Sequence, residues 1–110
     1  MSLSIEWTAT ALQSLEAVLE YTITEFGEAQ VRKLRSQIFR TVKRLSVYPQ
    51  MGAVEPFSSK TQYEYRGALV IKEIKIIYRV VEDRILIIYV KNARLDEKTM
   101  LFELRRQYRK

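Results

Sequence analysis

One continuous stretch, residues 65–94 (YRGALVIKEIKIIYRVVEDRILIIYVKNAR), constrains the fold of this chain more than any other. It is filled with Val, Ile, Leu and Tyr, which favour strands, and no proline interrupts it. Two short polar breaks, Lys72-Glu73 and Glu82-Asp83, divide it into three parts. If each break is a two-residue hairpin loop, the stretch forms three consecutive antiparallel strands.

The two-residue loops also fix a pairing register by counting. In this register Arg79 faces Leu86 on the third strand and Arg66 on the first, and Lys75 faces Val90. Side chains alternate between the two faces of a sheet, so the register sorts them into two sets. One face is almost wholly apolar and carries Tyr65, Leu69, Ile71, Ile74, Ile76, Tyr78, Val80, Ile85, Ile87 and Tyr89. The other mixes apolar and basic residues: Ala68, Val70, Ile77, Leu86, Ile88 and Val90 with Arg66, Lys75, Arg79 and Arg84.

The mixed face is where we expect function. Arg66 and Arg79 would be cross-strand neighbours, and like charges directly opposite each other destabilise a sheet. An anion or an acidic partner would compensate two such guanidinium groups. Arg94 has the same parity if the last strand stays extended, so we expect Arg66, Arg79 and Arg94 to form one cationic patch beside Lys75. The alternative is that Glu64, Glu82 or a C-terminal carboxylate neutralises these arginines within the fold.

Composition narrows the chemistry. The 110 residues predict one domain over 1–110, and 47% apolar residues suffice for a core. The chain has no cysteine and no histidine, so we expect no disulfide, no ordinary zinc site and no Ser-His or Cys-His nucleophile pair. Lys, Tyr, Glu or Asp would have to supply any acid–base chemistry, and no cofactor is expected. A net charge of +6 favours nucleic acid, a ribonucleoprotein surface or an acidic protein as partner.

The rest of the chain predicts helices around this sheet. Residues 3–7 indicate a short strand, and apolar spacing predicts one helix from a Thr8 or Thr10 cap to Gly27 and a second over about 28–47. The first helix is acidic and the second basic, which is typical of solvated faces and, in the second, also of a partner surface. Residues 48–62 predict a mobile surface loop, and residues 96–108 a final helix. Neither a leader nor a membrane-spanning run is visible, so we expect a cytoplasmic protein.

Helices and strands are segregated along the chain, which predicts an α+β fold. We expect the N-terminal strand and helix hairpin to pack on a mainly antiparallel sheet (β-α-α-β-β-β), followed by a C-terminal helix. The apolar face of the sheet would contact the hairpin, and the mixed face would stay more open.

An ordered set of residues across nearly the whole chain resembles the RelE/ParE superfamily of bacterial toxins, on its ParE-like, plasmid-stabilisation side. The set comprises Trp7 and Ala11, Tyr21, Phe26-Gly27, Leu45 and Pro49, Tyr65-Arg66, Tyr78-Arg79-Val80, and Arg94. The resemblance implies a small toxin neutralised by a cognate antitoxin whose disordered C-terminal part folds across it. The toxin would assemble as a homodimer or as a heterotetramer with the antitoxin.

The resemblance implies one of two activities. RelE-like members resemble ribosome-dependent endoribonucleases that cut mRNA, a reaction that needs a base, an acid and cations on the phosphate. For that activity the candidate catalytic residues here are Lys72, Lys75, Arg79, Arg94 and Tyr108. However, Leu101 stands about where such an enzyme has its tyrosine, so the acid–base set is incomplete.

ParE-like members resemble inhibitors of DNA gyrase, which act by binding and need no acid–base group. The incomplete catalytic set favours this activity, with Arg66, Lys75, Arg79 and Arg94 as the target-binding residues. A third interpretation is an inactive toxin-like domain that retains only antitoxin binding. The sequence gives no indication of which residues would bind the antitoxin.

Overall fold

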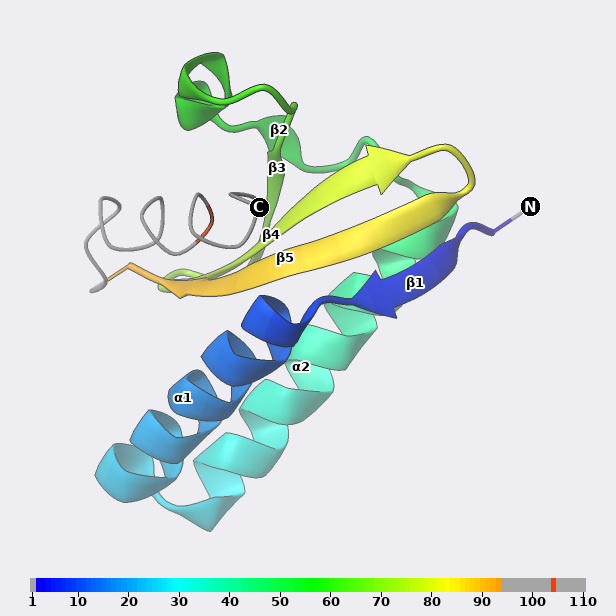
Figure 1. The fold of residues 1–110 in the computed structure, drawn as a ribbon. Helices are drawn as coiled ribbons and strands as arrows, with labels where there is room; N and C mark the ends of the chain where they lie inside the picture. The colour runs from blue at the N-terminus through cyan, green and yellow to red at the C-terminus, as the bar shows by residue number, and fades with distance from the viewer. Residues whose placement is uncertain (1, 94–103, 105–110) are drawn as a thin grey trace.

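The computed structural model describes residues 2–93 and Leu104, and it forms two layers (Figure 1). A helix hairpin of α1 (Ala9–Phe26) and α2 (Glu28–Val47) covers one face of a five-stranded sheet. The strands are β1 (Ser4–Trp7), β2 (Ala53–Val54), β3 (Arg66–Ile71), β4 (Ile74–Val81) and β5 (Arg84–Asn92). The predicted α+β architecture is therefore confirmed, while the predicted helix over 96–108 lies outside the described residues except for Leu104.

The sheet is mixed, with strand order β1-β5-β4-β3-β2. The three strands predicted from the 65–94 stretch pair as antiparallel neighbours, and β1 adds to β5 in parallel. Both polar breaks are two-residue turns, as expected. Glu82 adopts a positive φ of 55° in the second turn, a left-handed conformation that such tight hairpins require.

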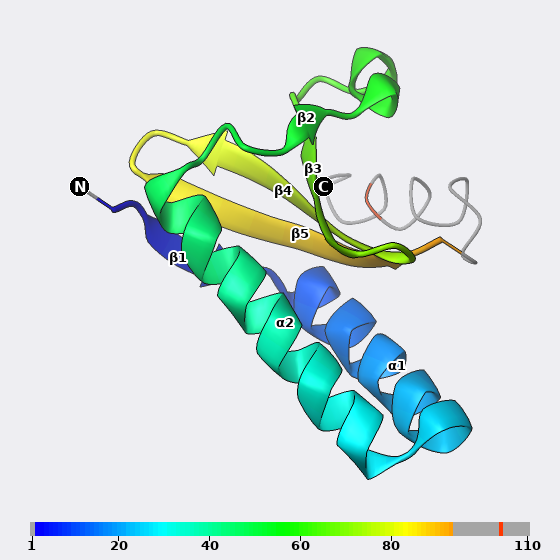
Figure 2. The same cartoon turned by 180° about the vertical axis from the view of Figure 1, so that it is seen from behind.

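Local sequence explains how the hairpin begins and turns. The Thr8 hydroxyl accepts a hydrogen bond from the Ala11 N–H at 3.1 Å and so caps α1. Gly27 ends α1 and at once precedes α2; its φ of 89° and ψ of 177° belong to a region that essentially only glycine occupies. Gly27 is therefore the single residue between the two helices, which run antiparallel and side by side beneath the sheet (Figure 2).

The predicted register is correct only near the turns. Val70 on β3 and Ile88 on β5 are extra residues that disturb the pairing, and each shifts the register by one beyond it. Arg66 consequently pairs with Tyr78 instead of Arg79, and Lys75 pairs with Lys91 instead of Val90. The predicted cross-strand pair of arginines is wrong for this reason.

Because of these two extra residues, several side chains lie on the opposite face of the sheet from the one predicted. Residues that were expected on the open face join the helix-facing core, among them Ala68 and Val90. Tyr65 and Tyr89, which were expected to face the helices, instead belong to a second apolar cluster on the opposite face, and Leu69 is 65% exposed. That second cluster comprises Phe57, Tyr65, Ile77, Ile88, Tyr89 and Leu104. The sheet therefore buries apolar side chains on both faces.

The segment 48–62, predicted to be a surface loop, packs against the sheet. It contains the short strand β2, which was not predicted, and a 3-10 helix, η1 (Pro56–Lys60). Phe57 from η1 is 2% exposed in the second cluster, so this segment forms part of the cover over the face that the helices leave free (Figure 1). Neither helix in the described part of the chain is long and apolar enough to cross a membrane.

Candidate functional site on the sheet face opposite the helices

Register decides which predicted site residues share a face. Lys75 and Arg79 are four residues apart on β4. Because side chains alternate between the two faces of a sheet, both project from the face opposite the helices. Arg66 pairs with Tyr78 and so takes the opposite side, toward the helices. The structure therefore brings Lys75 and Arg79 to one face and separates Arg66 from them. Arg94 and Tyr108 lie outside the described residues.

Arg66 is engaged in holding the fold. Its guanidinium donates a hydrogen bond to the Gly52 carbonyl oxygen at 2.8 Å, and it lies 3.6 Å from the Glu64 carboxylate. Glu64 was one of the carboxylates expected to neutralise an arginine internally, and for Arg66 that alternative is confirmed. The side chain thus anchors the chain between α2 and β2.

Lys75 also has an internal partner, one that sequence reasoning missed. Its ammonium group lies 3.0 Å from a carboxylate oxygen of Glu55, which is only 6% exposed. The pair crosses over Gly67, where an added Cβ would come within 2.6 Å of the Lys75 side chain. Glu55 lies between β2 and η1, and nothing in its local sequence marks it as the partner of a residue twenty positions away.

Arg79 differs from both. Its guanidinium carbon lies 3.7 Å from the ring centroid of Tyr63, a cation–π arrangement on the open side of β4. No carboxylate among the described residues lies within 4.0 Å of its guanidinium nitrogens. Stacking on an aromatic ring holds the guanidinium flat and leaves its N–H groups available, which suits recognition of a phosphate or a carboxylate.

Two further lysines extend the positive charge toward one end of this face. Lys91 pairs with Lys75 across β4 and β5, and Lys72 occupies the adjacent turn. Together with Leu69, Glu73 and Ala93 they line a pocket at the end of the sheet, so one carboxylate lies among these lysines. Lys91 was not predicted, because the extra residue Ile88 reverses its parity. We refer to Lys72, Lys75, Arg79 and Lys91 as the cationic sheet face.

A buried tyrosine of β4 lies on the other side of the sheet from these cations. Tyr78 is the residue whose pKa departs clearly from its ordinary value of 10.0: burial raises it, against the hydrogen bond from Gly52 and the charge of Arg66, which lower it. Its hydroxyl donates to the Pro49 carbonyl at 2.8 Å and accepts from the Gly52 N–H at 3.0 Å, on the helix-facing side. Among residues 2–93 and Leu104, no group of three or more acidic side chains is placed to hold a metal ion.

Comparison with known proteins adds a family and a fold. The family described as "ParE toxin of type II toxin-antitoxin system, parDE" matches residues 5–96 of this sequence. Among solved structures, a chain of the chromosomal ParDE TA system from P. aeruginosa has a similar fold, with a TM-score of 0.66 and 24% sequence identity. The likeness covers 83% of this chain and 96% of that chain. No curated protein matched the sequence.

Proposed function

This chain belongs to the ParE toxin family of type II toxin–antitoxin systems, and on that premise we propose that it acts by binding and inhibiting DNA gyrase. The partner of such a toxin within its system is a cognate antitoxin. Inhibition by binding, in the cytoplasm where gyrase works, requires a surface that recognises the target and no residue that transfers a proton.

Arg79 is the observation that carries this proposal. It is the arginine of the cationic sheet face, it lies on Tyr63, and among the described residues it has no carboxylate partner. A guanidinium held in this way is prepared to pair with an acidic or phosphate group, because the cost of ordering its side chain has already been met in the folded protein. We propose Arg79 as the central target-binding residue, with Lys75 and Arg94 as further target-binding residues.

Arg66 has a different place in the proposal. Its bonds to Gly52 and Glu64 leave it on the helix-facing side, so we propose that it supports the loop before β2 and contributes to the target surface only indirectly. Lys75 is likewise held by Glu55, so we propose that it contributes to the target surface less than Arg79 does. Both assignments favour binding over the endoribonuclease chemistry.

Two assays on the same purified toxin test the proposal. We expect the toxin, separated from its antitoxin, to abolish supercoiling by DNA gyrase while leaving cell-free translation unaffected. Blocked translation with cleaved mRNA and unaffected gyrase would instead show a ribosome-dependent endoribonuclease that uses Lys72, Lys75, Arg79, Arg94 or Tyr108. If neither assay responds and induction without antitoxin does not arrest growth, the chain is a toxin-like domain that retains only antitoxin binding.

A further inference from the structure

Nearly all of the net positive charge of this protein lies on one helix. α2 has six basic residues and one acidic residue, Glu28, which gives it a net charge of +5, while the whole chain has +6. A helix face that is only solvated usually carries both signs of charge in alternation, because opposite charges three or four residues apart stabilise it. α2 instead carries like charges, among them Arg40 and Arg44 at i and i+4, and such pairs destabilise a helix.

Five of the six cations lie on the side of α2 that faces solvent. At about 100° per residue they fall within an arc of about 120°, and they extend over about 18 Å of the helix axis. We call these five residues the basic face of α2: Arg32, Lys33, Arg40, Lys43 and Arg44. All five are exposed, and Figure 2 shows α2 in full view, with no other helix or strand of the described chain in front of it.

Within the described chain, the basic face has a single ion pair. Arg32 lies 3.6 Å from the carboxylate of Glu28, and both side chains are more than two-thirds exposed. For the other four cations, no carboxylate of the described residues lies within 4.0 Å of the charged group. The positive charge of this face is therefore available to an external anion.

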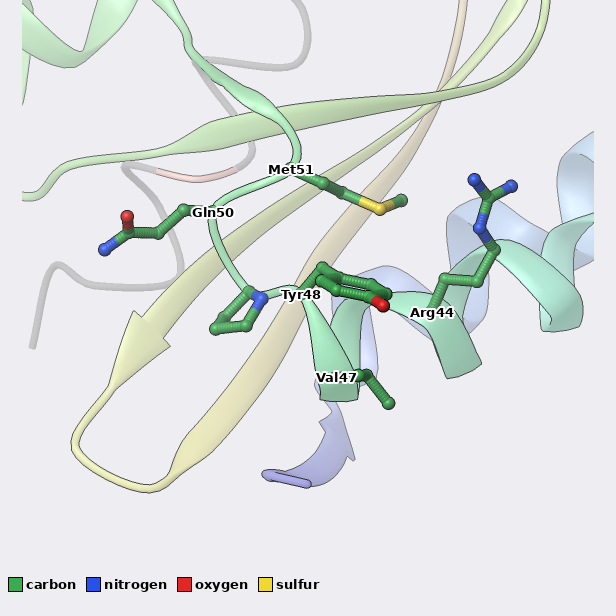
Figure 3. A pocket seen from close by; sticks show the side chains of 6 residues that line it. Arg44, Val47, Tyr48, Gln50 and Met51 are labelled. Atoms are coloured by element: carbon green, nitrogen blue, oxygen red, sulfur yellow. The ribbon is translucent and has the colours of Figure 1, made fainter. Parts of the chain in front are cut away.

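The basic face continues into a pocket at the C-terminal end of α2. Arg44 lines this pocket together with Tyr48, Gln50 and Met51, and Figure 3 shows these side chains around it. Tyr48 is 64% exposed. Tyrosine hydroxyls and glutamine amides donate hydrogen bonds to phosphate oxygens, as arginine and lysine do. The pocket therefore adds neutral donors to one end of the row of cations.

We infer that the basic face of α2 binds duplex DNA through its phosphate backbone. Duplex DNA carries one negative charge per about 1.7 Å of its axis, so a length equal to that of the basic face holds about ten phosphates. The five cations would pair with phosphates along this length, and Tyr48 and Gln50 would donate to a phosphate at its end. In the cell this duplex would be the one that gyrase holds, and that setting rests on the proposed function. The binding itself is a property of the toxin alone.

The residues between the cations favour duplex DNA over an acidic protein or a single strand. The other positions within the arc are Ala29, Ser36 and Val47. Protein interfaces take most of their binding energy from buried aromatic and other large anchors, and lysine is depleted in them. Single strands are bound by stacking their bases on aromatic side chains. The arc has no aromatic residue, and the neighbouring Phe39 packs on Trp7 with ring centroids 5.7 Å apart.

Removal of two cations, with a matched control elsewhere in the molecule, tests the inference. The test variant is Arg40→Gln with Lys43→Gln. The control is Arg84→Gln with Lys60→Gln, in β5 and η1, so each variant loses one arginine and one lysine. Binding of a labelled duplex of about 20 base pairs to the purified toxin, without gyrase, is measured by fluorescence anisotropy between about 50 and 200 mM salt. Far-UV circular dichroism and the urea midpoint verify that all three proteins fold.

We expect the logarithm of the wild-type association constant to fall with the logarithm of the salt concentration at a slope of about −4.5, as five phosphate contacts require. For the test variant the slope should be about −2.7, as three contacts require. At about 100 mM salt the test variant should bind at least about tenfold more weakly, and the control should lose less than about threefold.

Equal losses in the two variants would show that net charge alone matters and would overturn the inference. A wild type without measurable affinity for the duplex at about 50 mM salt would do the same. Displacement of the labelled duplex by polyglutamate as readily as by unlabelled duplex would assign the face to an acidic protein instead.

A gyrase supercoiling assay on the same proteins separates this inference from the proposed function. DNA binding by a wild type that does not inhibit gyrase would support the inference and contradict the proposed function. Gyrase inhibition by a wild type that does not bind the duplex would overturn the inference and support the proposed function.

Discussion

At the scale of single residues, Tyr78 fastens the segment between α2 and β2 to the sheet. Its hydroxyl bridges the Pro49 carbonyl and the Gly52 N–H, and Gly52 is buried so tightly that an added Cβ would lie 2.8 Å from that hydroxyl. A buried donor or acceptor that loses its partner costs more than an average hydrogen bond contributes. This side chain therefore explains why residues 48–52 are ordered although their sequence predicts a loop.

Removal of that hydroxyl should be costly. We expect Tyr78→Phe to lower the free energy of unfolding by about 1–3 kcal/mol, because the buried Gly52 N–H loses its acceptor. Tyr48→Phe, on an exposed tyrosine of the same segment, should change it by less than about 0.5 kcal/mol. Urea unfolding of the three proteins measures both differences, and similar values for the two variants would contradict the role given to Tyr78.

The difference in stability between the wild type and Tyr78→Phe should depend on pH. Burial raises the pKa of Tyr78 above 10.0, so the folded protein keeps this proton at a pH where the unfolded chain releases it. The contribution of Tyr78 to stability is thus fully present below pH 10.0 and is lost as the pH rises through the folded pKa. We expect the stability difference between wild type and Tyr78→Phe to shrink above pH 10.0, and a difference that grows there would contradict the direction of the shift.

The ion pair of Lys75 and Glu55 should behave as a structural contact. We expect Lys75→Met alone to destabilise the protein by about 1–3 kcal/mol, less than for a fully buried pair because the Lys75 side chain is 32% exposed. Lys75→Met combined with Glu55→Gln should recover most of that loss, since no charge then remains buried without a partner. A double variant no more stable than Lys75→Met, measured by urea unfolding, would show that the two side chains are not coupled.

At the scale of elements, periodicity was sufficient for the helices and for the antiparallel pairing of β3, β4 and β5, but not for their register or for the place of β1 beside β5. α2 was predicted over the residues it occupies, and Thr8 caps α1 as expected. The extra residues Val70 and Ile88 were not predictable, because each lies in a run of consecutive apolar residues that fits either face of a sheet. This one-residue shift separated Arg66 from Arg79. The strand β2 was not predicted, because its two residues, Ala53 and Val54, are too few to show an alternating pattern.

The two turns with positive φ give opposite expectations. Gly27→Ala should destabilise the protein by about 1–3 kcal/mol, because its backbone conformation is almost exclusive to glycine while the space around it is open. Glu82→Gly should leave stability unchanged or raise it by up to about 1 kcal/mol, because glycine adopts the left-handed conformation without strain. Thermal unfolding measures both. If Gly27→Ala were neutral, the hairpin would not depend on that conformation.

At the scale of the whole molecule, one sheet separates the helix hairpin from the face that we assign to the target. The helix-facing core holds the hairpin of α1 and α2 against one face of the sheet. The opposite face, covered in part by η1 and by Leu104, presents Arg79 on Tyr63, which we assign to the target. Substitutions on that face can therefore test the assignment to the target without disturbing the helix-facing core.

The most direct test of the central claim is a gyrase supercoiling assay with wild type, Arg79→Gln and Arg84→Gln. Arg84 is the matched control, because it lies on the neighbouring strand but is paired with Glu6 at 2.7 Å. We predict that wild type inhibits supercoiling, that Arg79→Gln needs at least about tenfold more protein for the same inhibition at unchanged unfolding free energy, and that Arg84→Gln behaves as wild type. Full inhibition by Arg79→Gln, or no inhibition by the wild type, would contradict the account.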